Sequence, residues 1–205
     1  MKSYKTVKLK TSAEFTEKKS VFIGYISPVS SEDDAKAFIS EIKKKHADAT
    51  HNVYAYILEG TEIARFSDDG EPGGTAGMPV LEVLKREGVC GVCVVVTRYF
   101  GGILLGAGGL VRAYAKAAKL AVDAAGICEF RPFVTFTLSV GYSDFEKIKK
   151  ELDTYGVKLD SCDFAEKVVF SLAVDQQKYS EFEKFVNDFT GASAVFNKTG
   201  MRYDA

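Results

Sequence analysis

The spacing of apolar positions near the start of the chain predicts strands and one helix. Residues 4–9 alternate between polar and apolar, as in a strand. Residues 13–19 and 21–26 predict a hairpin or two successive strands, with Lys18 and Lys19 at the turn. After Ser30 or Ser31 as a helix cap, apolar residues recur at helical spacing at Ala35, Phe38, Ile39 and Ile42. Residues 51–58 and 62–66 predict two further strands that pair across a turn.

The middle of the chain alternates helix and strand patterns around two glycine-rich turns. Residues 75–87 predict a helix whose inward positions are Met78, Leu81 and Leu84. The apolar residues 89–97 predict a buried central strand. Residues 110–125 form the longest helical pattern, with inward positions Leu110, Tyr114, Ala117, Ala121 and Ala124. Each turn leads into a helix and leaves backbone N–H groups at the positive end of its dipole, which favours anion binding.

The second half of the chain has a shorter and more regular pattern. Residues 134–140 predict a strand, Ser143 is expected to cap a helix, and residues 157–164 and 167–174 predict a hairpin. A second helix around Phe182 and a last strand at residues 192–197 complete a β-α-β-β-α-β order, which is the ferredoxin-like plan. We therefore predict an α+β fold with two domains, residues 1–128 and residues 131–205.

Composition narrows the functional classes. The chain has 205 residues, of which 46% are hydrophobic and 27% charged, as in soluble globular proteins. A formal net charge of -1 argues against coating nucleic acid through bulk charge and leaves a local basic patch open. No signal peptide and no apolar run of ~18 residues is present, so we expect a cytoplasmic protein that does not enter membranes.

The cysteines are expected to be free thiols rather than a disulfide framework. They are Cys90, Cys93, Cys128 and Cys162. Cys90 and Cys93 have the CxxC spacing of metal and redox sites. Within one strand these two side chains point to opposite faces, so we interpret them as core residues.

The first glycine-rich turn, SDDGEPGGTAG, has three interpretations. The acids Asp68, Asp69 and Glu71 are candidate oxygen ligands for Mg²⁺. Alternatively, the N–H groups around Gly73, Gly74 and Thr75 capture an anion at the helix start. The third interpretation is structural, with Asp or Ser side chains capping backbone groups.

The second turn, TRYFGGILLGAGGLVRAY, is the more specific signal. Arg98 ends a buried strand, where a cation must be paired or must face a cleft. Arg98 and Arg112 are candidates to clamp a phosphate, and the turn glycines allow backbone to approach it: Gly101, Gly102, Gly106, Gly108 and Gly109. Equally, Arg98 is a candidate to pair internally with Asp68 or Asp69. The spacing matches neither a P-loop nor a dinucleotide fingerprint.

The chain has two histidines, His46 and His51. His51 begins a strand and is a candidate to face the same cleft as the turns. No Ser or Cys is placed beside it by the sequence, so no nucleophile is assigned and the catalytic residues stay unknown.

Three segments resemble the YigZ/IMPACT family: HNVYAY at residues 51–56, RFSDDGEPGGTAGMPVL at residues 65–81 and VVVTRYFGGILLGAGGLVRAY at residues 94–114. The resemblance implies an Impact-type N-terminal domain with the fold of the second domain of ribosomal protein S5. It implies that the rest is similar to the last domain of elongation factor G, and it implies a link to translation. Eukaryotic members compete for the activator of an initiation-factor kinase. They use an additional N-terminal domain for part of that binding, so we do not expect their mechanism to apply here.

The leading hypothesis is a non-enzymatic, translation-associated binding protein whose N-terminal cleft engages a phosphate-bearing ligand, RNA or a ribosome-associated factor. Its expected ligand-binding residues are Gly73, Gly74, Thr75, Arg98, Gly101, Gly102, Gly106, Gly108, Gly109 and Arg112. The alternative is a metal-assisted enzyme acting on a phosphorylated or nucleotide small molecule, with Asp68 or Asp69 holding Mg²⁺ or acting as a base. A third hypothesis assigns a protein-docking role to the C-terminal domain.

Overall fold

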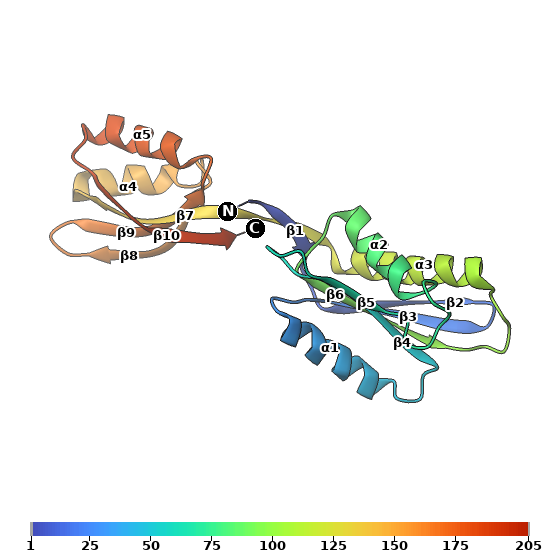
Figure 1. Cartoon of the computed structure of the whole chain (residues 1–205). Helices are drawn as coiled ribbons and strands as arrows, with labels where there is room; N and C mark the ends of the chain where they lie inside the picture. The colour runs from blue at the N-terminus through green and yellow to red at the C-terminus, as the bar shows by residue number, and fades with distance from the viewer. Residues whose placement is uncertain (1, 205) are drawn as a thin grey trace. The chain divides into compact units, whose positions relative to one another are not determined.

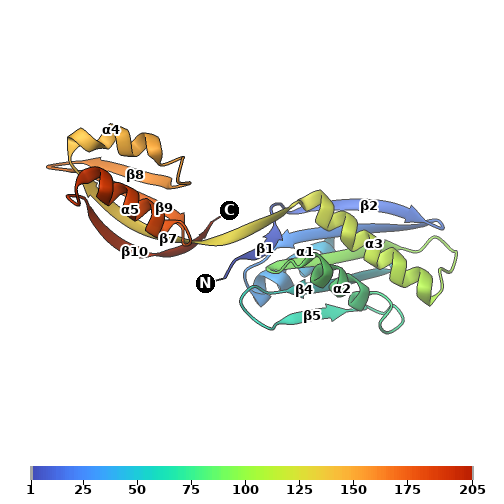
Figure 2. The same ribbon diagram turned by 90° about the horizontal axis from the view of Figure 1, so that it is seen from above.

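A computed structural model describes residues 2–204, which divide into two compact units. One unit spans residues 4–129, and the other consists of residues 130–204 with Lys2 and Ser3. In Figures 1 and 2 each unit is a sheet covered by helices. The predicted α+β fold class with two domains is confirmed.

The first unit is built on an antiparallel sheet with the order β2-β3-β6-β4-β5. The bounds are Tyr4–Val7 for β1, Thr11–Glu17 for β2, Ser20–Pro28 for β3, His51–Ile57 for β4, Ala64–Ser67 for β5 and Val92–Tyr99 for β6. β2 and β3 form the predicted hairpin, with Glu17 paired to Ser20. β6 is the central strand, and its run of valines is buried because helices cover both faces of the sheet.

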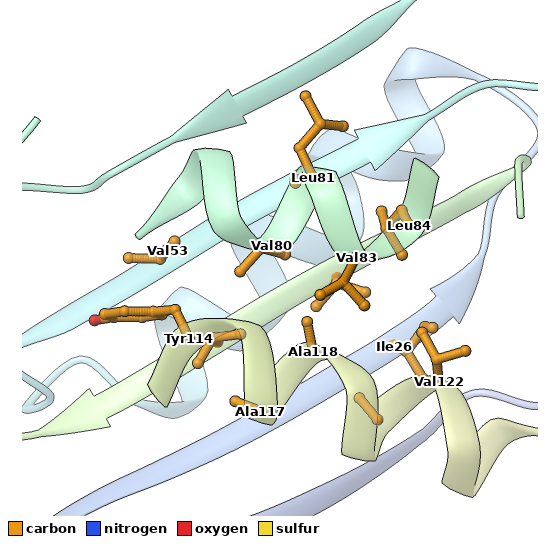
Figure 3. Packing of buried hydrophobic residues seen from close by; sticks show 14 of the residues in the cluster. Ile26, Val53, Val80, Leu81, Val83, Leu84, Tyr114, Ala117, Ala118 and Val122 are labelled. Carbon is orange, nitrogen blue, oxygen red and sulfur yellow. The ribbon is translucent and has the colours of Figure 1, made fainter. Parts of the chain in front are cut away.

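Helix α1 (Glu32–Lys45) covers one face of this sheet, and α2 (Gly77–Glu87) and α3 (Ala107–Ala125) cover the other (Figure 1). The Ser31 hydroxyl caps α1 by accepting from the Asp34 N–H at 3.1 Å, and all four predicted apolar positions of α1 are buried. Figure 3 shows the core between α2, α3 and the sheet, where the Tyr114 ring lies near Val53 and Val80.

Two inward positions predicted for these helices are wrong. Met78 is exposed, whereas Val80, Leu81 and Leu84 are buried, because α2 starts only at Gly77 and packs against both the sheet and α3. Ala124 is also exposed, and Ala125 is buried in its place. Runs of alanine do not distinguish neighbouring positions on a helix, so the sequence could not fix this phase.

The second unit follows the predicted β-α-β-β-α-β order. Its elements are β7 (Ile127–Val140), α4 (Tyr142–Glu151), β8 (Lys158–Phe164), β9 (Val168–Asp175), α5 (Tyr179–Thr190) and β10 (Val195–Asp204). The strands lie in the order β10-β7-β9-β8, the interleaved arrangement of the ferredoxin-like plan. Both helices lie on the sheet of this unit (Figure 2). Ile148 of α4 and Phe182 of α5 are buried in one core with Phe136 and Phe170 of the strands.

Two boundaries in this unit differ from prediction. Ser143 lies inside α4, whose N-cap is Gly141, so it does not cap the helix. The last strand runs from Val195 to Asp204 instead of residues 192–197. Most of β10 is polar and exposed, and its backbone pairing with β7 defines it as a strand, which a hydrophobic pattern does not detect.

The cysteines of the CxxC differ in environment. Cys93 is buried in β6 among the core residues beneath α1, and burial raises the pKa of its thiol. Cys90 precedes the strand and is half-buried. Over residues 2–204, no helix combines the length and the apolar character needed to cross a membrane.

Candidate nucleic-acid interface

The first glycine-rich turn is filled by a side chain of the protein itself. The Asp68 carboxylate accepts hydrogen bonds from the backbone N–H groups of Gly74 at 2.9 Å, Ala76 at 3.1 Å and Gly77 at 2.8 Å. Ala76 is the N-cap of α2 and Gly77 is its first residue, so Asp68 supplies the negative charge that this helix terminus favours. Thr75 turns back to the Pro72 carbonyl at 2.7 Å. The geometry is that of the structural interpretation, in which an aspartate caps the helix.

Asp69 is tied to the sheet rather than to the turn. Its carboxylate accepts from the Asn52 N–H at 2.7 Å and from the Lys43 ammonium at 2.6 Å. Burial alone would raise the pKa of Asp69, but these bonds outweigh it and hold the pKa below its ordinary value. Asp69 has a positive φ of 46°, a strained conformation that these contacts fix.

Glu71 is the acceptor at the centre of a buried network. Its Oε1 atom accepts from Arg98 Nη1 at 2.5 Å and from the Tyr114 hydroxyl at 2.7 Å, and all three side chains are buried. Burial, together with the charge of Glu71, raises the pKa of Tyr114, so the hydroxyl stays protonated and donates. Arg98 therefore has a carboxylate partner, and this partner is Glu71 rather than Asp68 or Asp69.

Arg98 is further enclosed by aromatic rings. Its guanidinium lies 5.5 Å from the centroid of Phe22 and 5.4 Å from that of Phe100. Its Nε atom is buried without a hydrogen-bond partner. With only 5% of its surface exposed, Arg98 is placed to hold β6 to the first turn and not to reach a ligand in solvent.

His51 lies beside this network. Its Nδ1 atom is 2.8 Å from the Asp69 carbonyl oxygen, so Nδ1 carries the proton and donates. Its Nε2 atom is 3.8 Å from Glu71 Oε1. The carboxylates of Asp68, Asp69 and Glu71 each accept hydrogen bonds from different donors and do not converge on one point. Within residues 2–204, no three His, Cys, Asp or Glu side chains are grouped to hold a metal ion.

The second glycine-rich turn has a different arrangement, because the start of α3 is open. Gly106 is the N-cap, no side chain caps it, and the first turn of α3 holds no acid. Gly101 allows close packing, since a Cβ there would lie 2.0 Å from the Lys19 carbonyl carbon. Gly102 and Gly106 have positive φ, and Gly108 lies near the Arg112 guanidinium. Gly106, Gly108, Gly109 and Arg112 therefore lie in the first turns of α3, whereas Gly101 packs against the β2–β3 turn.

A groove of ≈ 270 Å³ runs beside this terminus, and we call it the basic groove. Its lining residues come from β2, the β2–β3 turn and α3: Phe15, Glu17, Lys18, Leu105, Gly109, Arg112, Ala113 and Lys116. Three cations and one carboxylate line it, so its net charge is positive although the chain as a whole is slightly acidic.

The three cations of the basic groove are free of carboxylate partners. Within residues 2–204, Lys18, Arg112 and Lys116 form no salt bridge, whereas Lys119, one turn further along α3, pairs with Asp123 and Glu87. The Lys116 ammonium instead lies 4.3 Å from the centroid of the Phe15 ring. Cations without a partner are available to a bound anion.

The turn that presents Lys18 is strained. Lys18 and Lys19 have φ of 45° and 64°, in the left-handed region that favours Gly and Asn. Side chains with a Cβ cost roughly 1–2 kcal/mol each in this conformation. Two lysines in a strained conformation at one turn suggest that their charges have a function.

The structure thus separates the predicted site residues into two groups. Asp68, Asp69, Glu71, Arg98 and His51 join the buried network or the α2 cap. Arg112 and Gly109 line the basic groove, and Gly106 and Gly108 lie at the start of α3 beside it. Phe15, Lys18 and Lys116 were not predicted as site residues. A signal was present for Lys18, which was placed at a turn, but none linked β2 to α3.

Both halves of the chain are similar to known proteins. Residues 18–122 match the Impact N-terminal domain, and residues 138–193 match a domain of unknown function, DUF1949. The chain is similar to the IMPACT family member YvyE of Bacillus subtilis (strain 168), 40% identical over 98% of this chain and 93% of that protein. It is similar to the IMPACT family member YigZ of Escherichia coli (strain K12), 35% identical over 86% and 88%.

A solved structure described as the crystal structure of a hypothetical protein also resembles the chain. The two are 33% identical and superpose with a TM-score of 0.62, over 96% of this chain and 97% of the other.

Proposed function

The chain belongs to the IMPACT family, and from that premise we propose that it acts in the cytoplasm as a translation-associated binding protein that engages a phosphate-bearing ligand such as RNA. In this proposal the ligand lies in the basic groove of the first unit. The observation that carries it is a set of three cations around one groove, Lys18, Arg112 and Lys116, which form no salt bridge within residues 2–204.

The chemistry of the basic groove suits phosphate. Arg112 offers a planar fork of donors that matches two phosphate oxygens, and Lys18 and Lys116 act as point charges on either side. The open N–H groups at the start of α3 add donors with the same preference. The ligand therefore meets a cluster of donors in a chain whose remaining surface carries little net charge.

Arg98 and the first turn have a supporting role in this proposal. Arg98 is buried and paired with Glu71, and Asp68 accepts from the N–H groups of Ala76 and Gly77 at the start of α2, so neither Arg98 nor these N–H groups are placed to bind a phosphate from solvent. Arg98 holds the end of β6 to the first turn, and Asp68 holds that turn to the start of α2. This differs from a clamp in which Arg98 and Arg112 hold one phosphate together.

The proposal is tested by fluorescence polarisation with labelled RNA oligonucleotides at two salt concentrations. We expect Arg112→Ala and Lys116→Ala each to weaken binding about five- to tenfold at low salt, because each removes one phosphate contact. Arg86→Ala is the matched control: Arg86 is exposed in the last turn of α2 and does not line the basic groove.

Equal losses from Arg112→Ala and Arg86→Ala would show that RNA is held by general charge and not by the basic groove. No binding by the wild-type chain, even at low salt, would overturn the proposal itself.

A further inference from the structure

We infer that the basic groove selects single-stranded over duplex RNA by stacking one unpaired base on the ring of Phe15. The inference rests on the proposed function and specifies the ligand of the same groove. It starts from the one aromatic side chain that lines the groove among its three cations.

Phe15 stacks on a buried ring, and the ammonium of Lys116, another residue of the basic groove, lies over the Phe15 ring. Its ring stacks on Phe22 with centroids 5.3 Å apart and an interplanar angle of 12°, and Phe22 in turn meets Tyr114 edge to face at 5.3 Å. Phe22 and Tyr114 are fully buried, so they fix the plane of the Phe15 ring. Phe15 itself is half-buried and is one of the residues that line the basic groove.

The groove above the ring has the chemistry of a base pocket with a phosphate rim. Leu105 and Ala113 add apolar walls, and Lys18, Arg112 and Lys116 supply the charge. At present the Lys116 ammonium occupies the space over the ring at 4.3 Å from its centroid. A base that stacks on Phe15 takes this place, and the flexible lysine moves to the adjoining phosphate.

Duplex RNA does not satisfy this arrangement. Its bases are stacked and paired within the helix, so a duplex presents phosphates and sugar hydroxyls to the cations and leaves the ring unused. Exposed apolar side chains near the groove also favour a single strand over a duplex. Ile103 and Leu104 lie on the loop that leads to Leu105, and Leu104 is 81% exposed. Splayed bases of a single strand cover such surface, whereas a phosphate backbone does not.

The experiment compares a single-stranded oligonucleotide with its duplex, using the full chain and polarisation at fixed salt. We expect Phe15→Leu to weaken single-strand binding by roughly 5- to 150-fold, the range for loss of one base–aromatic stack, and to leave duplex binding unchanged. Phe15→Tyr keeps the ring and should keep the affinity. Phe164→Leu is the control, because Phe164 is an exposed aromatic in β8.

A second readout does not depend on Phe15→Leu being well folded. The chain contains no Trp, so Phe15→Trp introduces a single indole at the groove. We expect its fluorescence to be quenched when the single strand binds and to stay unchanged with the duplex, because only an unpaired base contacts the indole.

The outcomes separate the two proposals. Equal binding of single strand and duplex, lost in Lys116→Ala but unaffected by Phe15→Leu and accompanied by no quenching, would overturn the stacking inference and leave the phosphate-binding function in place. Absence of binding to either RNA would overturn both.

Discussion

Replacing Lys18 and Lys19 by Asn and Gly should make the protein more stable and at the same time weaken its binding to RNA. The two lysines form a two-residue hairpin loop, since Glu17 pairs with Ser20, and both have positive φ. Such loops favour Asn followed by Gly, whose conformations fit the twist of the flanking strands. Lys18 and Lys19 are therefore residue types that this positive-φ conformation disfavours.

The size of the effect follows from these dihedral angles. Removing the Cβ at Lys19, which has a φ of 64°, relieves roughly 1–2 kcal/mol of strain. The greater conformational freedom of glycine in the unfolded chain lowers the unfolding free energy by roughly 0.5–1 kcal/mol. Asn at position 18 contributes a smaller gain. The net increase in unfolding free energy is then about 1 kcal/mol, which corresponds to a rise in Tm of roughly 2–4 °C for a chain of this length.

Urea and thermal unfolding measure the stability, and polarisation with RNA measures the binding. Lys150→Asn in the exposed face of α4 is the control for loss of a lysine outside the basic groove. The reasoning is refuted if Lys18→Asn with Lys19→Gly lowers the unfolding free energy. Unchanged RNA affinity in the same variant would remove Lys18 from the site.

Two further predictions concern the buried network. Glu71→Gln leaves the Arg98 charge buried without its partner and should cost about 3–5 kcal/mol of unfolding free energy, whereas Glu71→Gln combined with Arg98→Met should recover much of this loss in urea titrations. A single variant as stable as wild type would contradict the assigned pairing. Asp69 has a lowered pKa, so its contribution to stability is present above about pH 3.8 and is lost as the pH falls through the lower folded pKa. Asp69→Asn should therefore differ from wild type in unfolding free energy at about pH 6 and converge with it toward about pH 2; a constant difference would contradict this.

Local patterns were sufficient for much of the fold. The β2–β3 hairpin and α1 were predicted with their turn, cap and buried positions, because an apolar period and a cap are properties of neighbouring residues. Met78 and Ala124 were misplaced because the inward face of a helix depends on which elements pack against it. β10 was predicted too short because its polar residues are held by pairing with β7.

For the candidate site, the sequence predicted the region but not which residues contact each other. The glycine-rich turns identified the right region, but the sequence could not tell that Asp68 fills the start of α2 while the start of α3 stays open. Glu71, Asp68 and Asp69 are chemically similar neighbours, and only their positions in space assign Glu71 to Arg98. Phe15 and Lys116 are distant in the chain and meet only because β2 packs against α3.

The most direct test of the central claim is the salt dependence of RNA binding by wild type and by a variant with Lys18, Arg112 and Lys116 all changed to Ala. For a single strand, each phosphate contact contributes about 0.7 to the slope of log K against log salt. If the basic groove holds the backbone, the variant should bind more weakly with a slope shallower by about 2. An unchanged slope and affinity would contradict the assignment of the groove as the nucleic-acid interface.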